Sequence, residues 1–188
     1  MWDRISNWLY KISSGWIALV GLAVFLLFSA LVLPGESAQT DLYAGEAGSP
    51  DLSFYYSPAD LYRMAEAYGV SGREAYIRSR LTFDLVFPLI YTFFLSTSIS
   101  WLYPRAFAGK RWWQRANILP LLGMLFDYLE NFSVLLVMLR YPKLSPGIDA
   151  FASVSTMMKW GFIAASFVLL LIGVAAFIWR WFKNRGRS

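Results

Sequence analysis

Long apolar stretches alternate with polar segments along the 188-residue chain. Four of them are long enough to span a membrane, and they run from about Gly15 to Leu33, Leu81 to Tyr103, Asn117 to Leu139 and Phe151 to Trp181. A helix needs about 20 residues to cross the ~30 Å hydrocarbon core of a bilayer. The pattern therefore predicts an all-α integral membrane protein, a four-helix bundle that forms a single domain over residues 1–188.

The first apolar stretch resembles either a cleaved signal peptide or a membrane anchor. Arg4 and Lys11 precede it, as basic residues precede the core of a signal peptide. The apolar run is longer than such a core, and Pro34 and Glu36 interrupt the small-residue pattern of a cleavage site. We expect an uncleaved anchor.

The segment from 34 to 77 is the largest piece outside the predicted spans. Its first half is rich in turn-forming residues and is expected to be irregular. Its second half predicts an amphipathic helix with Ser57 as the N-cap and Pro58 in the first turn. Apolar residues recur at helical spacing along this helix, at Leu61, Met64, Ala65 and Tyr68. We expect the helix to lie either on the membrane or on the bundle.

This helix should stop at Gly69, because glycine is the usual residue just past a helix end. A second short helix is predicted from about Ser71, with Glu74 completing a capping box. It should run directly into the second membrane span.

The composition is typical of a membrane protein. Hydrophobic residues make up 57% of the chain and charged residues 15%, against about a quarter charged in soluble domains. The absence of cysteine and histidine excludes disulfides, thiol catalysis, typical zinc sites and His-ligated haem. We expect no cofactor and no metal, although a carboxylate-only site for a hard cation is compatible with the sequence.

The formal charge of +5 is distributed unevenly. The segment PRAFAGKRWWQRAN and the C-terminal RWFKNRGRS are basic and contain no acid, whereas the segment from 34 to 77 carries most of the acids. Basic residues collect in cytoplasmic loops. We therefore expect a plasma (inner) membrane protein with both termini cytoplasmic, and no nucleic-acid partner. An aromatic belt is predicted at the inner interface, formed in part by Trp112, Trp113, Trp179 and Trp181.

The third span contains a polar group in the sequence LFDYLENFSVLLVM. Asp127, Glu130 and Asn131 are spaced i, i+3, i+4 and so project from one face of a helix. Glu130 lies ten residues before Arg140, which places it about 15 Å inside the span. These residues should face the interior of the bundle.

The second and fourth spans offer partners for this group. Arg80 and Asp84 are spaced i, i+4 near the start of the second span, and Lys159 lies about two turns inside the fourth. A charged side chain at the centre of a span costs about 2.5–3.5 kcal/mol on insertion scales. We therefore predict that these charges meet inside the bundle. The candidate ligand-binding residues are Arg80 at the mouth, Asp84, Asp127, Glu130, Asn131 and Lys159.

Several functions are compatible with this cluster. The first is binding of a small polar ligand or a lipid headgroup, because intramembrane ionisable residues are often functional. The second is an accessory subunit of a larger membrane complex, in which the cluster is a salt-bridge network that fixes helix register. An enzyme that uses Glu130 as a base is a weaker candidate, so catalysis is uncertain and not favoured. Expected partners are membrane lipids, and either membrane-protein subunits or further copies of the chain.

Overall fold

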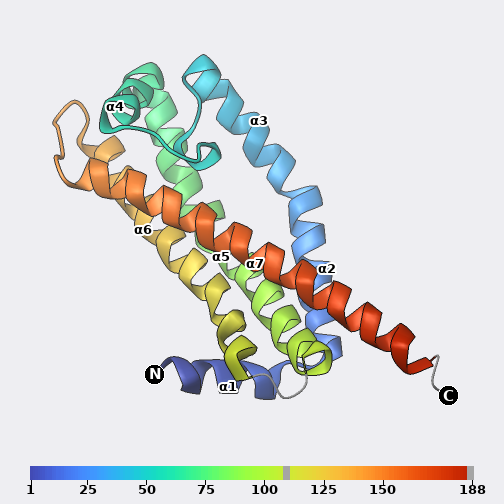
Figure 1. The fold of residues 1–188 in the computed structure, drawn as a ribbon. Coiled ribbons are helices and arrows are strands. Elements are labelled where there is room, and N and C mark those ends of the chain that lie inside the picture. The colour runs from blue at the N-terminus through green and yellow to red at the C-terminus, as the bar shows by residue number, and fades with distance from the viewer. Residues whose placement is uncertain (108–110, 186–188) are drawn as a thin grey trace. The chain divides into compact units, whose positions relative to one another are not determined.

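The computed structural model describes residues 1–107 and 111–185, apart from the side chains of 111–114. This part of the chain consists of helices and turns without a strand, so the predicted all-α class is confirmed. The α-helices are α1 (Trp2–Ile12), α2 (Gly15–Leu31), α3 (Leu33–Ala44), α4 (Pro58–Ala67), α5 (Gly69–Ala106), α6 (Leu119–Arg140) and α7 (Ile148–Arg185) (Figure 1). Short 3₁₀ helices cover Gly45–Ala47 (η1), Pro50–Leu52 (η2) and Arg111–Ile118 (η3).

Four helical stretches are long and apolar enough to cross a membrane: Gly15–Ala47, Gly69–Ala106, Arg115–Arg140 and Ile148–Arg185. They contain the four predicted spans, which supports the assignment to multi-pass membrane proteins. α5 and α7 have 38 residues each. At 1.5 Å per residue each is about 57 Å long, so both extend well beyond the ~30 Å that a span requires.

The expectation of irregular structure after the first span was wrong for residues 34–44, which belong to α3. Pro34 lies in the first turn of this helix, where its missing N–H is not needed. The same proline cannot continue α2, because it cannot donate to the carbonyl of Ala30 and its ring would clash there. The break is therefore confined to Val32.

The chain forms two compact units. The first unit comprises Met1–Leu26, Ile90–Leu122 and Phe162–Ser188, and the second comprises Leu27–Leu89 and Gly123–Gly161. α5, α6 and α7 are each divided between the two units, with one segment in the first and one in the second.

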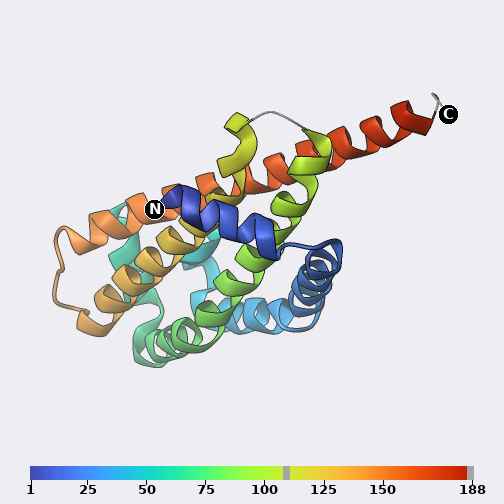
Figure 2. The same ribbon diagram turned by 90° about the horizontal axis from the view of Figure 1, so that it is seen from below.

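In the first unit, α1 runs across α5 and the start of α6 (Figures 1 and 2). Its core includes Ile99, Leu102 and Tyr103 of α5, packed against Leu169 of α7. Trp179 and Trp181 of α7 are exposed, as an aromatic belt requires. Several residues of the predicted basic segments and belt lie outside the described side chains: Lys110, Arg111, Trp112, Trp113 and Arg187.

In the second unit, α4 confirms the amphipathic helix predicted from the sequence. Ser57 Oγ accepts a hydrogen bond from the Asp60 backbone N–H at 3.2 Å, and the Asp60 carboxylate accepts one from the Ser57 N–H at 3.0 Å. The latter bond, more than any other contact, lowers the pKa of Asp60. The apolar stripe of α4 is buried against Val134, Val137 and Met138 of α6. The helix was expected to lie either on the membrane or on the bundle, and the structure shows it packed on the bundle.

Gly69 separates α4 from α5 with a φ of 62°, a conformation that costs little only for glycine. The stop predicted there is confirmed. α5 begins at Gly69 itself, so the predicted start at Ser71 was two residues late. The helix then continues without interruption into the second span, as expected.

Candidate functional site

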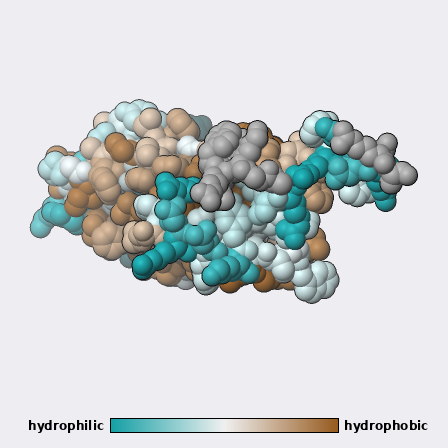
Figure 3. All heavy atoms as spheres, turned by 60° about the horizontal axis from the view of Figure 1, so that its bottom comes forward, coloured by the Kyte–Doolittle hydropathy of each residue, from teal (hydrophilic) through white to brown (hydrophobic). Residues whose placement is uncertain are grey.

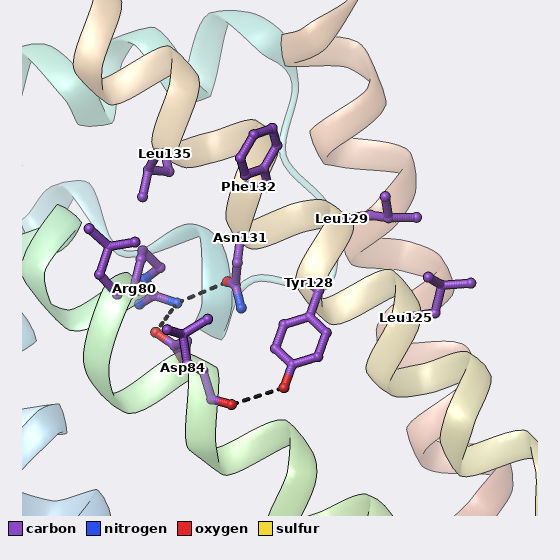
Figure 4. A pocket seen from close by; sticks show the side chains of 10 residues that line it. Arg80, Asp84, Leu125, Tyr128, Leu129, Asn131, Phe132 and Leu135 are labelled. Carbon is purple, nitrogen blue, oxygen red and sulfur yellow. Dashed lines mark hydrogen bonds and ion pairs between the residues drawn. The ribbon is translucent and has the colours of Figure 1, made fainter.

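The second unit contains a buried network of charged and polar side chains, which we call the charged cluster. Arg80 on α5 pairs with Asp84 one turn later, with 2.8 Å between Nη1 and Oδ2. The same Nη1 donates to Asn131 Oδ1 on α6 at 3.3 Å (Figure 4). Asn131 Nδ2 in turn donates to Asp127 Oδ1 at 3.1 Å. The amide of Asn131 therefore joins the arginine of α5 to the acids of α6.

Lys159 on α7 completes the connection between the three helices. Its Nζ forms an ion pair with Glu130 and lies 3.8 Å from Asp127 Oδ1. Glu130 and Lys159 are 1% and 4% exposed. The prediction is confirmed for the base of the fourth span, since Lys159 meets both acids of the third. Arg80 of the second span instead pairs with Asp84 and reaches the third span through Asn131. All six predicted residues belong to one network.

Asp51 also belongs to the charged cluster, although it was not predicted from the sequence. It lies on η2, between α3 and α4, and its carboxylate forms an ion pair with Arg80. Its Oδ1 lies 3.6 Å from Lys159 Nζ. No local pattern distinguishes Asp51 from the other acids of its segment, such as Asp41, so only the tertiary structure identifies it.

A short chain of hydroxyl groups extends the network beyond Glu130. Thr156 Oγ1 lies 2.7 Å from Glu130 Oε1 and 3.0 Å from the hydroxyl of Tyr56. Thr156 Oγ1 is the donor in both contacts, so Glu130 and the hydroxyl of Tyr56 compete for its single proton. Burial, and secondarily the charge of Glu130, raises the pKa of Tyr56, which keeps its hydroxyl protonated.

The surroundings of Arg80 differ from the prediction. Arg80 was expected at the mouth of a pocket, but it is only 6% exposed. Its guanidinium lies over the ring of Tyr76, with 4.4 Å between Cζ and the ring centroid. Its Nε has no hydrogen-bond acceptor among the described residues. Arg78, a neighbouring basic residue on α5, is exposed.

The charged cluster contains more acids than bases. Its carboxylates are those of Asp51, Asp84, Asp127 and Glu130, and its bases are Arg80 and Lys159. Asp51 therefore adds to an excess of carboxylates that the residues predicted from the sequence already have. Within the described part of the chain, no three metal-ligating side chains are grouped to hold an ion.

An open pocket between α5 and α6 reaches the charged cluster, and we call it the groove. Its volume is about 460 Å³, within the range of about 300–1,000 Å³ typical of small-molecule sites. Arg80, Asp84 and Asn131 line one part of it, next to the hydroxyl of Tyr128, which donates to the Leu85 carbonyl at 2.9 Å (Figure 4). The remaining walls are apolar and consist of Leu81, Leu85, Leu125, Leu129, Phe132 and Leu135.

No protein-family model, no curated protein and no solved structure matches the chain. The chemistry of the site has to be read from its own residues.

Proposed function

We propose that the chain is a multi-pass membrane protein that binds a membrane lipid, with the headgroup at the charged cluster and an acyl chain in the groove. The observation that carries this proposal is the composition of the groove. Six apolar side chains form its walls, and buried residues of the charged cluster line one part of it. An amphiphile matches both parts of such a pocket.

The polar part of the groove offers two kinds of contact to a headgroup. Arg80 Nε is a buried donor without an acceptor among the described side chains, and a phosphate or ester oxygen of a lipid would satisfy it. The excess of carboxylates favours a headgroup that also carries a positive charge. A zwitterionic phospholipid headgroup supplies both.

The apolar part of the groove is open where membrane lipids are available. Leu81, Leu85, Leu125 and Phe132 are about half exposed or more, and they lie on helices long and apolar enough to span the bilayer. An acyl chain could therefore enter from the side, without passing through water.

A second candidate function is a structural one within a larger complex. Every carboxylate of the charged cluster lies within 4 Å of Arg80 or Lys159, as a network that fixes helix register requires. On this hypothesis the chain is an accessory subunit, and the groove holds only loosely bound lipid.

Native mass spectrometry of protein extracted gently from its own membrane tests the proposal. We expect a discrete lipid adduct on the wild-type chain. Leu125→Trp should fill the groove and remove the adduct. Leu139→Trp is the matched control, because Leu139 is a comparably exposed leucine of α6 that does not line the groove.

The outcomes separate the two candidate functions. An adduct that is lost in Leu125→Trp and in Glu130→Gln but kept in Leu139→Trp supports lipid binding at the charged cluster. Equal amounts of adduct on the wild type and on all three variants contradict lipid binding at the charged cluster. Co-extracted protein subunits without a discrete lipid favour the accessory role.

We also propose that both termini are cytoplasmic. Asp3 is the only acid of the first unit, whereas its basic residues are numerous, and basic segments stay in the cytoplasm. The chain has no cysteine, so single cysteines at the exposed positions Lys183 and Glu46 provide clean labels. In intact cells, an impermeant maleimide should label Glu46→Cys and not Lys183→Cys. The reverse pattern would invert the proposed orientation.

A further inference from the structure

Helix α1 lies across α5 and the start of α6 rather than along them (Figure 2). This helix of 11 residues covers the basic region before the first span, and it was not predicted from the sequence. It buries Ser6 and Leu9 against the rest of the first unit. A helix that runs across membrane spans at their ends lies along the membrane surface.

Hydrogen bonds hold α1 in this position. Asn117 Nδ2 donates to the Ser6 carbonyl at 3.2 Å and to Ser100 Oγ at 2.9 Å, and Ser6 Oγ donates to Asn117 Oδ1 at 2.8 Å. Asn117 is fully buried. At the surface, Arg115 donates to both oxygens of Asp3, at 2.8 and 3.1 Å. The orientation of α1 is thus fixed by contacts to η3, which is itself bonded to α5 through Asn117 and Ser100.

The opposite face of α1 is basic and aromatic. Arg4, Trp8 and Lys11 follow one another at i, i+4 and i+7 and are all exposed, with Trp8 58% exposed. Tryptophan favours the level of the lipid headgroups, and arginine and lysine attract anionic ones. This face, which we call the basic face of α1, has the chemistry of a surface-bound membrane helix.

The net positive charge of the whole first unit also favours contact with an anionic membrane surface. Asp3 is its only acid, and it is already paired with Arg115. Exposed basic residues at the same unit's helix ends include Arg105 of α5 and Lys183 and Arg185 of α7. Figure 3 shows hydrophilic side chains gathered over α1 and along the C-terminal part of α7. No acid of the unit is left to offset Arg4 and Lys11.

We infer that the basic face of α1 binds the headgroups of anionic phospholipids, with Arg4 and Lys11 contacting phosphate and Trp8 inserted at headgroup level. This site is separate from the charged cluster and does not depend on the function proposed for it. Each basic residue near an anionic surface contributes about 1 kcal/mol. Loss of both should therefore weaken the preference for anionic lipid by roughly tenfold to thirtyfold.

The test is competition between two defined lipids on the full chain. Purified protein in detergent is given equal amounts of phosphatidylglycerol and phosphatidylcholine, and the bound lipids are counted by native mass spectrometry. We expect the wild type to retain phosphatidylglycerol preferentially and the Arg4→Gln/Lys11→Gln variant to lose this preference. The Arg4→Lys/Lys11→Arg variant keeps both charges and should keep the preference.

A matched control removes the same charges elsewhere. Arg78→Gln/Lys143→Gln also replaces one exposed arginine and one exposed lysine, but in the second unit. It should bind phosphatidylglycerol as the wild type does. The inference is overturned if Arg4→Gln/Lys11→Gln retains the wild-type preference, or if the control loses as much. Unchanged circular dichroism of each variant excludes loss of fold as the cause.

Discussion

Asp51 and Arg80 form a buried ion pair that ties the segment between α3 and α4 to membrane helix α5. The second oxygen of the same carboxylate faces Lys159 of α7. A single side chain outside the predicted spans thus contacts both bases of the charged cluster, and segment 45–57 is held on the helices through it.

Replacing Asp51 should therefore loosen this segment. In Asp51→Asn we expect faster amide hydrogen exchange over residues 45–57, because a buried charge-assisted contact worth about 1–3 kcal/mol is lost. Asp41→Asn, at an exposed position of α3, is the control and should leave the exchange unchanged. Equal exchange in all three proteins would mean that η2 is held by other contacts.

Lys159 and Glu130 should be strongly coupled. Lys159→Met removes the base that faces Glu130 and Asp127, so the free energy of unfolding should fall by about 3–5 kcal/mol. Adding Glu130→Gln should restore part of the loss, since one buried negative charge disappears with it. Denaturant unfolding in mixed micelles measures all four members of this double-mutant cycle. Strictly additive effects would contradict the pairing.

Two glycines should respond to alanine with opposite signs. Gly69 has a φ of 62°, so Gly69→Ala should lower the free energy of unfolding by about 1–2 kcal/mol. Gly161 lies within α7 with open space where the methyl group of an alanine would lie, and Gly161→Ala should raise it by about 0.5–1 kcal/mol. Thermal unfolding in detergent gives both signs directly. A stabilised Gly69→Ala would be incompatible with the backbone described for the α4–α5 junction.

The buried hydroxyl of Tyr56 should make stability depend on alkaline pH. Burial and then Glu130 raise its pKa above 10.0 in the folded protein. Its contribution to stability is therefore complete below pH 10.0 and is lost as the pH rises toward the folded pKa. The free energy of unfolding should fall more steeply above pH 10.0 in the wild type than in Tyr56→Phe.

Tyr55→Phe provides the control for this measurement, because Tyr55 is 60% exposed. It should follow the wild-type curve. If Tyr56→Phe also follows that curve, the hydroxyl of Tyr56 is not buried in the way described.

The sequence was most informative where a residue's environment follows from its own helix. Apolar length located the spans, and helical spacing placed Asp127, Glu130 and Asn131 on one face, because both depend on local geometry. Because an unpaired charge in a span is costly, Lys159 was expected to lie next to the acids of the third span. In the structure, Lys159 is a neighbour of Asp127.

The sequence was least informative where tertiary contacts decide the structure. Asp51 enters the charged cluster through an irregular segment, whose path no periodicity describes. Turn-forming residues also misled the interpretation of 34–44, because proline is favoured in the first turn of a helix as well as just beyond a helix end. Helix α1 was missed because Arg4 and Lys11 were considered as the flank of a signal peptide or anchor and not as part of a helix.

The ion pair of Arg80 with Asp84 lies within a single helix, and this matters for biosynthesis. α5 can enter the bilayer with its charges already paired, at little cost. Glu130 has no such ion-pair partner within α6, and Lys159 has none within α7. Each of these charges therefore costs about 2.5–3.5 kcal/mol of insertion free energy until Glu130 and Lys159 meet. Release of α6 from the translocation machinery should therefore wait for the arrival of α7, because Glu130 of α6 is paired only once Lys159 of α7 has reached it.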